Sequence, residues 1–145
     1  MYTGNIYVKL RHYGLINYLF NLQNPKVMFL QLAHTKLDIF QCSRELALSC
    51  YRLTRQFPDS EKFGMVQQIR RAALSIHLNI SEGCSRRSKN ERKRYFEISR
   101  GSVIEVDTAL DIALALNYAT LEEMQPTGIL LVRAFSMLSA LIKDN

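Results

Sequence analysis

The sequence predicts an all-α protein, an antiparallel up-and-down four-helix bundle. From about residue 33 onward, apolar residues recur every three or four positions, which is the period of an amphipathic helix. Capping and breaking residues divide this pattern into four segments, and no alternating pattern typical of strands occurs after Met28. Four amphipathic helices joined by short turns are typical of such a bundle.

The first two predicted helices are separated by a proline. The first covers residues 37–56, and Pro58 ends it because proline disfavours helical geometry in the residue before it. The second covers residues 61–82. Gly83 follows at the position where a C-terminal cap is expected, since glycine adopts the left-handed conformation without strain.

The other two predicted helices both start at a capping box. The third covers residues 89–116 and follows the S-x-x-E sequence at 88–91. The fourth covers residues 120–142 and starts with T-x-x-E at 120–123. Pro126 is expected to kink or split this helix, because its ring clashes with the preceding turn and it donates no backbone hydrogen bond.

The N-terminal segment differs from the rest of the chain. A length of 145 residues fits one domain, but residues 1–27 hold four of the seven tyrosines and three bases, with no acid. They also lack helical periodicity. We therefore predict that residues 1–31 form a disordered or non-native extension, with Met28 as the natural start. Residues 32–145 form the four-helix-bundle domain.

Cysteine content and hydropathy predict a cytoplasmic protein. Cys42, Cys50 and Cys84 are an odd number without C-x-x-C spacing, so we expect buried reduced thiols. Apolar runs in the sequence fall short of a membrane span, and the apolar stretch near the N-terminus lacks the cleavage site of a signal peptide. We therefore expect no membrane partner.

Catalytic sequence motifs are absent. The chain contains no nucleophile elbow, zinc-protease motif, phosphate-binding loop or dinucleotide fingerprint, and none of its histidines belongs to the E-x-x-H pairs of di-iron bundles. Asp107 and Asp111 share one helical face, but nothing supplies further metal ligands, so a solvated or intersubunit acidic face is the preferred interpretation. We predict no enzyme, no catalytic residue, no metal and no cofactor.

Positive charge is concentrated in one window of the sequence. The net charge is +6, and residues 70–100 alone contain nine bases and three acids, which also gives +6. Residues 101–132 contain five acids and no base. We take the bases of the window as candidate nucleic-acid-binding residues: Arg70, Arg71, Arg86, Arg87, Lys89, Arg92, Lys93, Arg94 and Arg100.

One polar stripe of the third predicted helix is basic at its start and acidic at its end. Lys89, Lys93 and Arg100 share a 40° arc with Asp107 and Asp111 at 100° per residue. This order opposes the helix macrodipole, so helix stability did not select it. A bound anion or a neighbouring subunit is the simpler cause, and phosphate fits the free N–H groups of the turn before the helix. The alternatives are an acidic protein partner and an ordinary solvated surface.

The second predicted helix places polar groups inside a wide apolar arc. Arg70 and His77 lie among apolar residues, and buried polar groups need partners. One interpretation is a salt bridge within the bundle. The other is that this helix contacts both its own bundle and a neighbouring subunit.

Several sequence segments together resemble a known family. They are LDIF at 37–40, FP at 57–58, QIRRAALSI at 68–76, NISEG at 79–83, Arg86, Ser88, Glu91 and MLSALI at 137–142. In these segments the chain resembles the bacterial four-helix-bundle proteins encoded within intervening sequences of 23S rRNA genes. The accessory variability protein of diversity-generating retroelements is related to them.

The resemblance implies a cytoplasmic bundle that assembles as a ring-shaped homopentamer with a basic surface. The basic positions of the family map onto Arg70, Arg71, Arg86 and Arg87. We therefore expect a non-catalytic, oligomeric accessory protein that binds RNA or DNA around the turn between the second and third helices. The alternative is an interaction scaffold that docks an acidic partner, a nucleic-acid enzyme such as a reverse transcriptase, or a ribosomal component.

Overall fold

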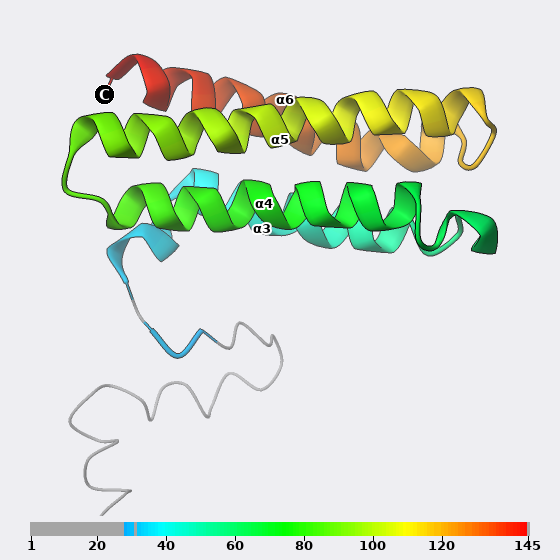
Figure 1. Cartoon of the computed structure of the whole chain (residues 1–145), viewed down its shortest axis with the longest axis horizontal. Helices are drawn as coiled ribbons and strands as arrows, with labels where there is room; N and C mark the ends of the chain where they lie inside the picture. The colour runs from blue at the N-terminus through cyan, green and yellow to red at the C-terminus, as the bar shows by residue number, and fades with distance from the viewer. Residues whose placement is uncertain (1–27, 31, 145) are drawn as a thin grey trace, which may run out of the picture. The chain divides into compact units, whose positions relative to one another are not determined.

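The computed structural model describes residues 28–30 and 32–144. A compact unit starts at Leu32. Within these residues there are four α-helices, two short 3₁₀-helices and no strand (Figure 1). The elements are η1 (Ala33–Lys36), α3 (Asp38–Leu53), η2 (Asp59–Glu61), α4 (Met65–Ser85), α5 (Lys89–Ala115) and α6 (Leu121–Asp144). The predicted start at Met28 depends on residues 1–27, which lie outside the described residues, so it stays a prediction.

The four helices form an up-and-down bundle, which confirms the predicted all-α class. Helices that follow one another in the chain lie side by side and run in opposite directions (Figure 1). α3 packs against α4, α4 against α5 and α5 against α6, and α6 closes the bundle against α3.

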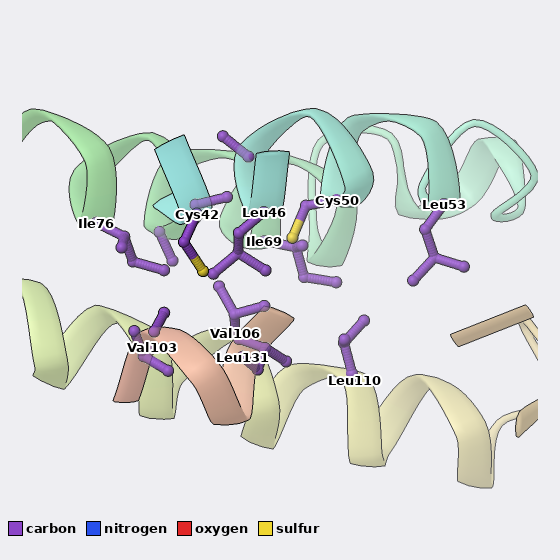
Figure 2. Packing of buried hydrophobic residues seen from close by; sticks show 14 of the residues in the cluster. Cys42, Leu46, Cys50, Leu53, Ile69, Ile76, Val103, Val106, Leu110 and Leu131 are labelled. Atoms are coloured by element: carbon purple, nitrogen blue, oxygen red, sulfur yellow. The ribbon is translucent and has the colours of Figure 1, made fainter. Parts of the chain in front are cut away.

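The core lies where the apolar faces of the helices meet. Figure 2 shows Leu46 and Ile69, from α3 and α4, facing Val106 of α5 and Leu131 of α6. Leu46, Ile69 and Val106 are fully buried. Burial of this kind is the main favourable contribution to folding, at roughly 1.5–3 kcal/mol for each large aliphatic side chain.

The cysteines follow the prediction in two cases of three. Cys42 and Cys50 are free and buried in the core, and burial raises the pKa of Cys50 to about 12. Cys84 is also free but only half-buried, so the expectation of a buried thiol is wrong for this residue. It lies near the end of α4 and packs against the edge of the core.

The second predicted helix begins four residues later than expected, at Met65. The segment before it forms η2, and the carboxylate of Glu61 accepts a hydrogen bond from the Met65 backbone N–H at 3.1 Å. A carboxylate at a helix start satisfies a free donor and complements the macrodipole. The Glu61 side chain, at the end of η2, therefore helps to cap α4, whose N-cap residue is Gly64.

The expected role of Gly83 as a helix cap is wrong. α4 continues to Ser85, and Gly83 is buried within it. A Cβ at this position would lie 2.7 Å from Cε1 of Phe96 and 3.2 Å from Cβ of Tyr95. The glycine is there because α4 and the ring of Phe96 approach too closely for any side chain.

The capping boxes lie where the sequence predicts them. Ser88 Oγ accepts a hydrogen bond from the Glu91 N–H at 3.5 Å at the start of α5. Before α6 the bonds are reciprocal: the Glu123 carboxylate accepts from the Thr120 N–H at 2.7 Å, and Thr120 Oγ1 accepts from the Glu123 N–H at 3.3 Å. The hydrogen bond from the Thr120 backbone lowers the pKa of Glu123.

α5 ends within one residue of the predicted boundary, and α6 continues through Pro126. Asn117 adopts a left-handed conformation (φ 57°), and the N–H groups of residues 117 and 118 bond back to Leu114 and Ala113, which stops α5. Pro126 does not split the last helix, because α6 runs unbroken from Leu121 to Asp144, and the kink expected there stays a prediction. Buried Thr127, next to the proline, bonds to Ser49 of α3 at 2.7 Å and fixes this stretch to the bundle.

Candidate nucleic-acid interface

The nine candidate basic residues fall into two groups in the structure. Three of them, Arg70, Arg86 and Arg100, turn back and contact other helices. The remaining six lie on α4, in the α4–α5 turn and on the first turns of α5, with exposed or half-exposed side chains. The two groups differ in their contacts and not in their exposure, because Arg70, Arg86 and Arg100 are half-exposed, as are Arg92 and Lys93 of the second group.

Arg70 connects α4 to α3. Its Nε donates a hydrogen bond to Thr54 Oγ1 at 2.8 Å, and its guanidinium lies 5.0 Å from the ring centre of Tyr51. Thr54 is buried and in turn donates to the Cys50 carbonyl at 2.8 Å. These contacts give Arg70 a role in helix packing, and its part in nucleic-acid binding stays a prediction.

His77 finds its partner inside the bundle, but the partner is not an acid. Its Nδ1 lies 2.8 Å from Ser43 Oγ, and its ring packs against Phe40 with ring centres 4.4 Å apart. Burial lowers the pKa of His77, and the nearby positive charge of Arg44 adds to this effect. The salt-bridge interpretation is therefore wrong, because His77 and Arg70 bond to the hydroxyl groups of Ser43 and Thr54. The other interpretation, that this helix also contacts a neighbouring subunit, stays a prediction.

Arg86 joins the end of α4 to the start of α5. It forms an ion pair with Glu82 one turn earlier and donates to the hydroxyl of Tyr95 at 3.2 Å. Its guanidinium lies 5.2 Å from the ring centre of Tyr95, and Glu82 raises the pKa of Arg86. Arg86 therefore fixes the turn that carries the other basic residues.

Arg100 connects α5 to α6. Its guanidinium lies 5.8 Å from the ring centre of Phe135, and one of its terminal nitrogens is 3.5 Å from Ser139 Oγ. The polar stripe predicted for this helix therefore faces the seam with α6 from Arg100 onward.

The outer basic surface consists of the exposed or half-exposed bases of the α4–α5 turn and the first turns of α5, apart from Arg86. Six bases and one acid fall within residues 86–94. In the described part of the chain, Arg87, Lys89, Lys93 and Arg94 make no ion pair with another side chain. The N-terminus of α5 adds the partial positive charge of its macrodipole to the same place. The members of this surface are Arg87, Lys89, Arg92, Lys93 and Arg94.

Arg71 lies apart from that surface. It is exposed in the middle of α4 and donates to Gln68 Oε1 at 3.1 Å. Gln68 also bonds to Glu105 of α5, so Arg71 stands beside an acidic neighbour rather than inside the basic surface.

The acidic half of α5 does not form a metal site in the described residues. Asp107 and Asp111 are exposed, and within residues 28–30 and 32–144 no group of three or more His, Cys, Asp or Glu side chains is arranged to hold a metal ion. The two carboxylates instead line pockets between α5 and α6. These pockets were missed at the sequence level, although the apolar residues on the outward side of α6 are a signal that could have indicated them.

α6 is more apolar than expected from the sequence. Its 24 residues include an 18-residue window of mean hydropathy 1.4, of which 28% is buried, so by length and composition alone it could cross a membrane. This corrects the expectation that every apolar run is too short. A core helix of a water-soluble bundle passes the same test, so this finding is weak evidence for a membrane span.

Comparison with known proteins assigns the family. A sequence model of the 23S rRNA-intervening sequence proteins matches residues 35–140, well over half of the chain. The chain belongs to this family. It is also similar in structure to a protein of unknown function from the S23 ribosomal protein family of Bacteroides thetaiotaomicron, with a TM-score of 0.66 and 22% identity. That match covers 72% of this chain and 98% of the other, and at this identity it shows the fold alone.

Curated proteins supply no further match. Membership in the intervening-sequence family confirms the resemblance carried by the segments at 37–40, 68–76 and 137–142. The family description names the genomic context of its genes and states no activity. For this family member, function has to be argued from the outer basic surface.

Proposed function

We propose that this protein is a non-catalytic, oligomeric accessory protein that binds RNA or DNA through the outer basic surface. The observation that supports this most is the set of four basic side chains at the α4–α5 turn that have no acidic partner among the described residues. Charges left unneutralised by the fold can replace the counterions of a phosphate backbone, which favours binding that depends on salt and not on sequence.

The location of these charges supports phosphate as the ligand. Arg86 and Tyr95 hold the turn in place, so the neighbouring basic residues are carried by a fixed backbone. Tyr95 is half-buried, and Arg86 lies over one face of its ring, so that face is not available for base stacking. The surface therefore suits backbone contacts that do not distinguish sequences.

We further propose that the protein assembles as a ring-shaped homopentamer in the cytoplasm. Each copy would contribute one basic surface, and several linked weak sites bind a long polyanion with greater avidity than one. Partners that handle nucleic acid, such as a reverse transcriptase or a ribosomal component, could then be recruited to the same complex.

The test is a triple charge reversal that leaves the packing arginines intact. Arg87→Glu, Lys89→Glu and Arg94→Glu together should abolish binding to random-sequence single-stranded RNA and DNA, measured by fluorescence anisotropy. In the wild type, affinity should fall steeply between about 50 and 200 mM salt. A plot of the logarithm of the binding constant against the logarithm of the salt concentration has a negative slope. Neutralising any one base that binds a phosphate should make this slope less steep by roughly 0.7 for single strands.

A matched control changes the charge by the same amount elsewhere. Arg52→Glu, Arg55→Glu and Lys143→Glu alter exposed bases outside the surface and should leave most of the affinity. Equal loss in both triple variants would mean that only net charge matters, and unchanged binding by the first would remove the surface as the site.

The second candidate is the interaction scaffold. It is favoured by the order of charges along α5, where bases come first and acids last, against the helix macrodipole. Pairing of the basic half with the acidic half of a neighbouring copy explains this order. In that case the first triple variant dissociates the oligomer in light scattering instead of losing nucleic acid.

A further inference from the structure

An apolar groove runs along the seam between α5 and α6, on a different part of the bundle from the outer basic surface. Two pockets of about 280 and 440 Å³ adjoin one another there and share Asp107 and Leu131. Their lining on α5 extends from Val103 to Leu114, which is about 17 Å of helix at 1.5 Å per residue. A groove of this length can accommodate about three turns of another helix.

The groove is bordered by apolar side chains that the fold leaves in water. Val132 of α6 is 70% exposed and Ile104 of α5 is 52% exposed, and both line the first pocket beside Phe135. Contiguous exposed apolar residues of this kind are typical of interaction sites. α6 thus carries apolar surface beyond what the four-helix core uses.

Gly128 gives the groove additional room. It lines the second pocket from the middle of α6, and a Cβ built there meets no atom within 4 Å. Glycine weakens a helix relative to alanine, and here no neighbour among the described residues requires it. Gly83 differs, because a Cβ at that position would clash with the ring of Phe96.

The charge around the groove selects the kind of occupant. Asp107 and Asp111 line it, and no lysine or arginine is among the described residues that line the two pockets. An anionic membrane would be repelled by these carboxylates. A helix that carries lysine or arginine beside its apolar face would be attracted.

We propose that the α5–α6 groove binds an amphipathic helix of a partner protein, with basic residues flanking its apolar face. Apolar side chains at positions i, i+3 or i+4 and i+7 enter the two pockets, and the flanking bases pair with Asp107 and Asp111. Arg100, held over Phe135, marks the end of the groove. The proposal stands on pockets and charges outside the outer basic surface, so it does not depend on nucleic-acid binding.

The experiment uses the full chain and a defined probe. The probe is a fluorescein-labelled helical peptide of about 14 residues, with leucine at i, i+3, i+4 and i+7 and lysine elsewhere. We expect saturable binding in fluorescence anisotropy. Gly128→Leu, which fills the groove, should raise the Kd about tenfold or more, as expected when an anchor pocket is blocked.

Gly101→Leu is the matched control. Gly101 is also a helical glycine with nothing within 4 Å of a built Cβ, but it does not line either pocket. This variant should bind the peptide like the wild type. Asp107→Asn with Asp111→Asn should raise the Kd several-fold at low salt, and a peptide with glutamate in place of lysine should bind much more weakly.

Several results would overturn the proposal. These are a lack of saturable peptide binding, equal effects of Gly128→Leu and Gly101→Leu, and equal binding of the glutamate peptide. A fall in molecular mass with Gly128→Leu in light scattering would assign the groove to a second copy of this chain. If the wild type sediments with phosphatidylglycerol vesicles and the Gly128→Leu variant does not, the groove would be assigned to a membrane surface. The triple reversal at Arg87, Lys89 and Arg94 should leave peptide binding intact, which separates this test from that of the nucleic-acid interface.

Discussion

The two sides of α5 are built differently, and the difference indicates which surface the fold uses and which it leaves open. Toward α4, Gly83 admits the ring of Phe96, and Ser99 donates to the Ile76 carbonyl of α4 at 2.9 Å. Toward α6, the seam opens into pockets bordered by exposed Ile104 and Val132. Small residues and hydroxyls close one seam, while large apolar residues that remain exposed border the open one.

This comparison implies that the two seams respond differently to added volume. Protein cores resist insertion of extra atoms because they are close-packed, whereas an open groove accepts them. Substitutions of the same chemical kind, placed on either side of α5, therefore test whether the seams differ as the structure indicates.

The largest effect is expected at Gly83. Gly83→Val would place side-chain atoms where a Cβ already meets Phe96 at 2.7 Å, so we expect a loss of about 3 kcal/mol in the free energy of unfolding, the upper end of the overpacking range. Urea denaturation measures this. Adding Phe96→Leu should recover part of the loss, since it removes the ring that clashes.

The control for this prediction lies on the open side. Gly128→Ala adds the first atom of a side chain where nothing lies within 4 Å, and it should stabilise the protein by up to about 1 kcal/mol through helix propensity. If Gly83→Val proved no more destabilising than Gly128→Ala, the two seams would not differ in packing.

A smaller effect is expected from a pair of serines. Ser99 is buried and bonds across the α4–α5 seam, so Ser99→Val removes a hydrogen bond and adds volume, at a cost of about 1.5 kcal/mol. Ser136 is exposed and lines the α5–α6 groove. Ser136→Val should stay within about 0.5 kcal/mol of the wild type in the same urea measurement. Similar losses for both serines would contradict the comparison.

The sequence predicts the four helices well because capping boxes and apolar periodicity are local signals. The starts of α5 and α6 follow directly from Ser88 and Thr120. Gly83 was interpreted wrongly because its role depends on a tertiary contact, the approach of Phe96. α6 also stays unsplit at Pro126, where Thr127 bonds to Ser49 of α3. A local rule for glycine or proline contains no information about such neighbours.

The sequence predicts where the candidate site lies, but not which of the basic residues form it. Charge counting locates the basic window, because charge is a property of composition. It does not separate Arg70, Arg86 and Arg100, which contact Tyr51, Tyr95 and Phe135, from the bases of the outer basic surface. That separation depends on which aromatic residue another helix brings within reach. The α5–α6 groove was missed for the same reason, since only the packed helices define it.

The smallest effect is expected in the pH dependence of stability. It tests whether the close packing of the α4–α5 seam also holds in the seam between α3 and α4. There His77 bonds to Ser43 and packs on Phe40, and burial together with Arg44 lowers its pKa below the ordinary value near 6.5. Arg44 of α3 and His34 of η1 are the charged or titratable groups that act on it. Below about pH 6.5 the unfolded chain takes up a proton at this histidine that the folded chain resists, so stability should fall as the pH drops from about 7.5 to 5.

His77→Gln removes the titration while keeping a polar side chain at the position. Its urea midpoint should therefore change less between these pH values than that of the wild type, since carboxylates contribute equally to both proteins. Equal pH dependence in the two proteins would mean that protonated His77 is tolerated in the fold. The α3–α4 seam would then be open to water at this point, and the closed side of the bundle would be limited to the contact between α4 and α5.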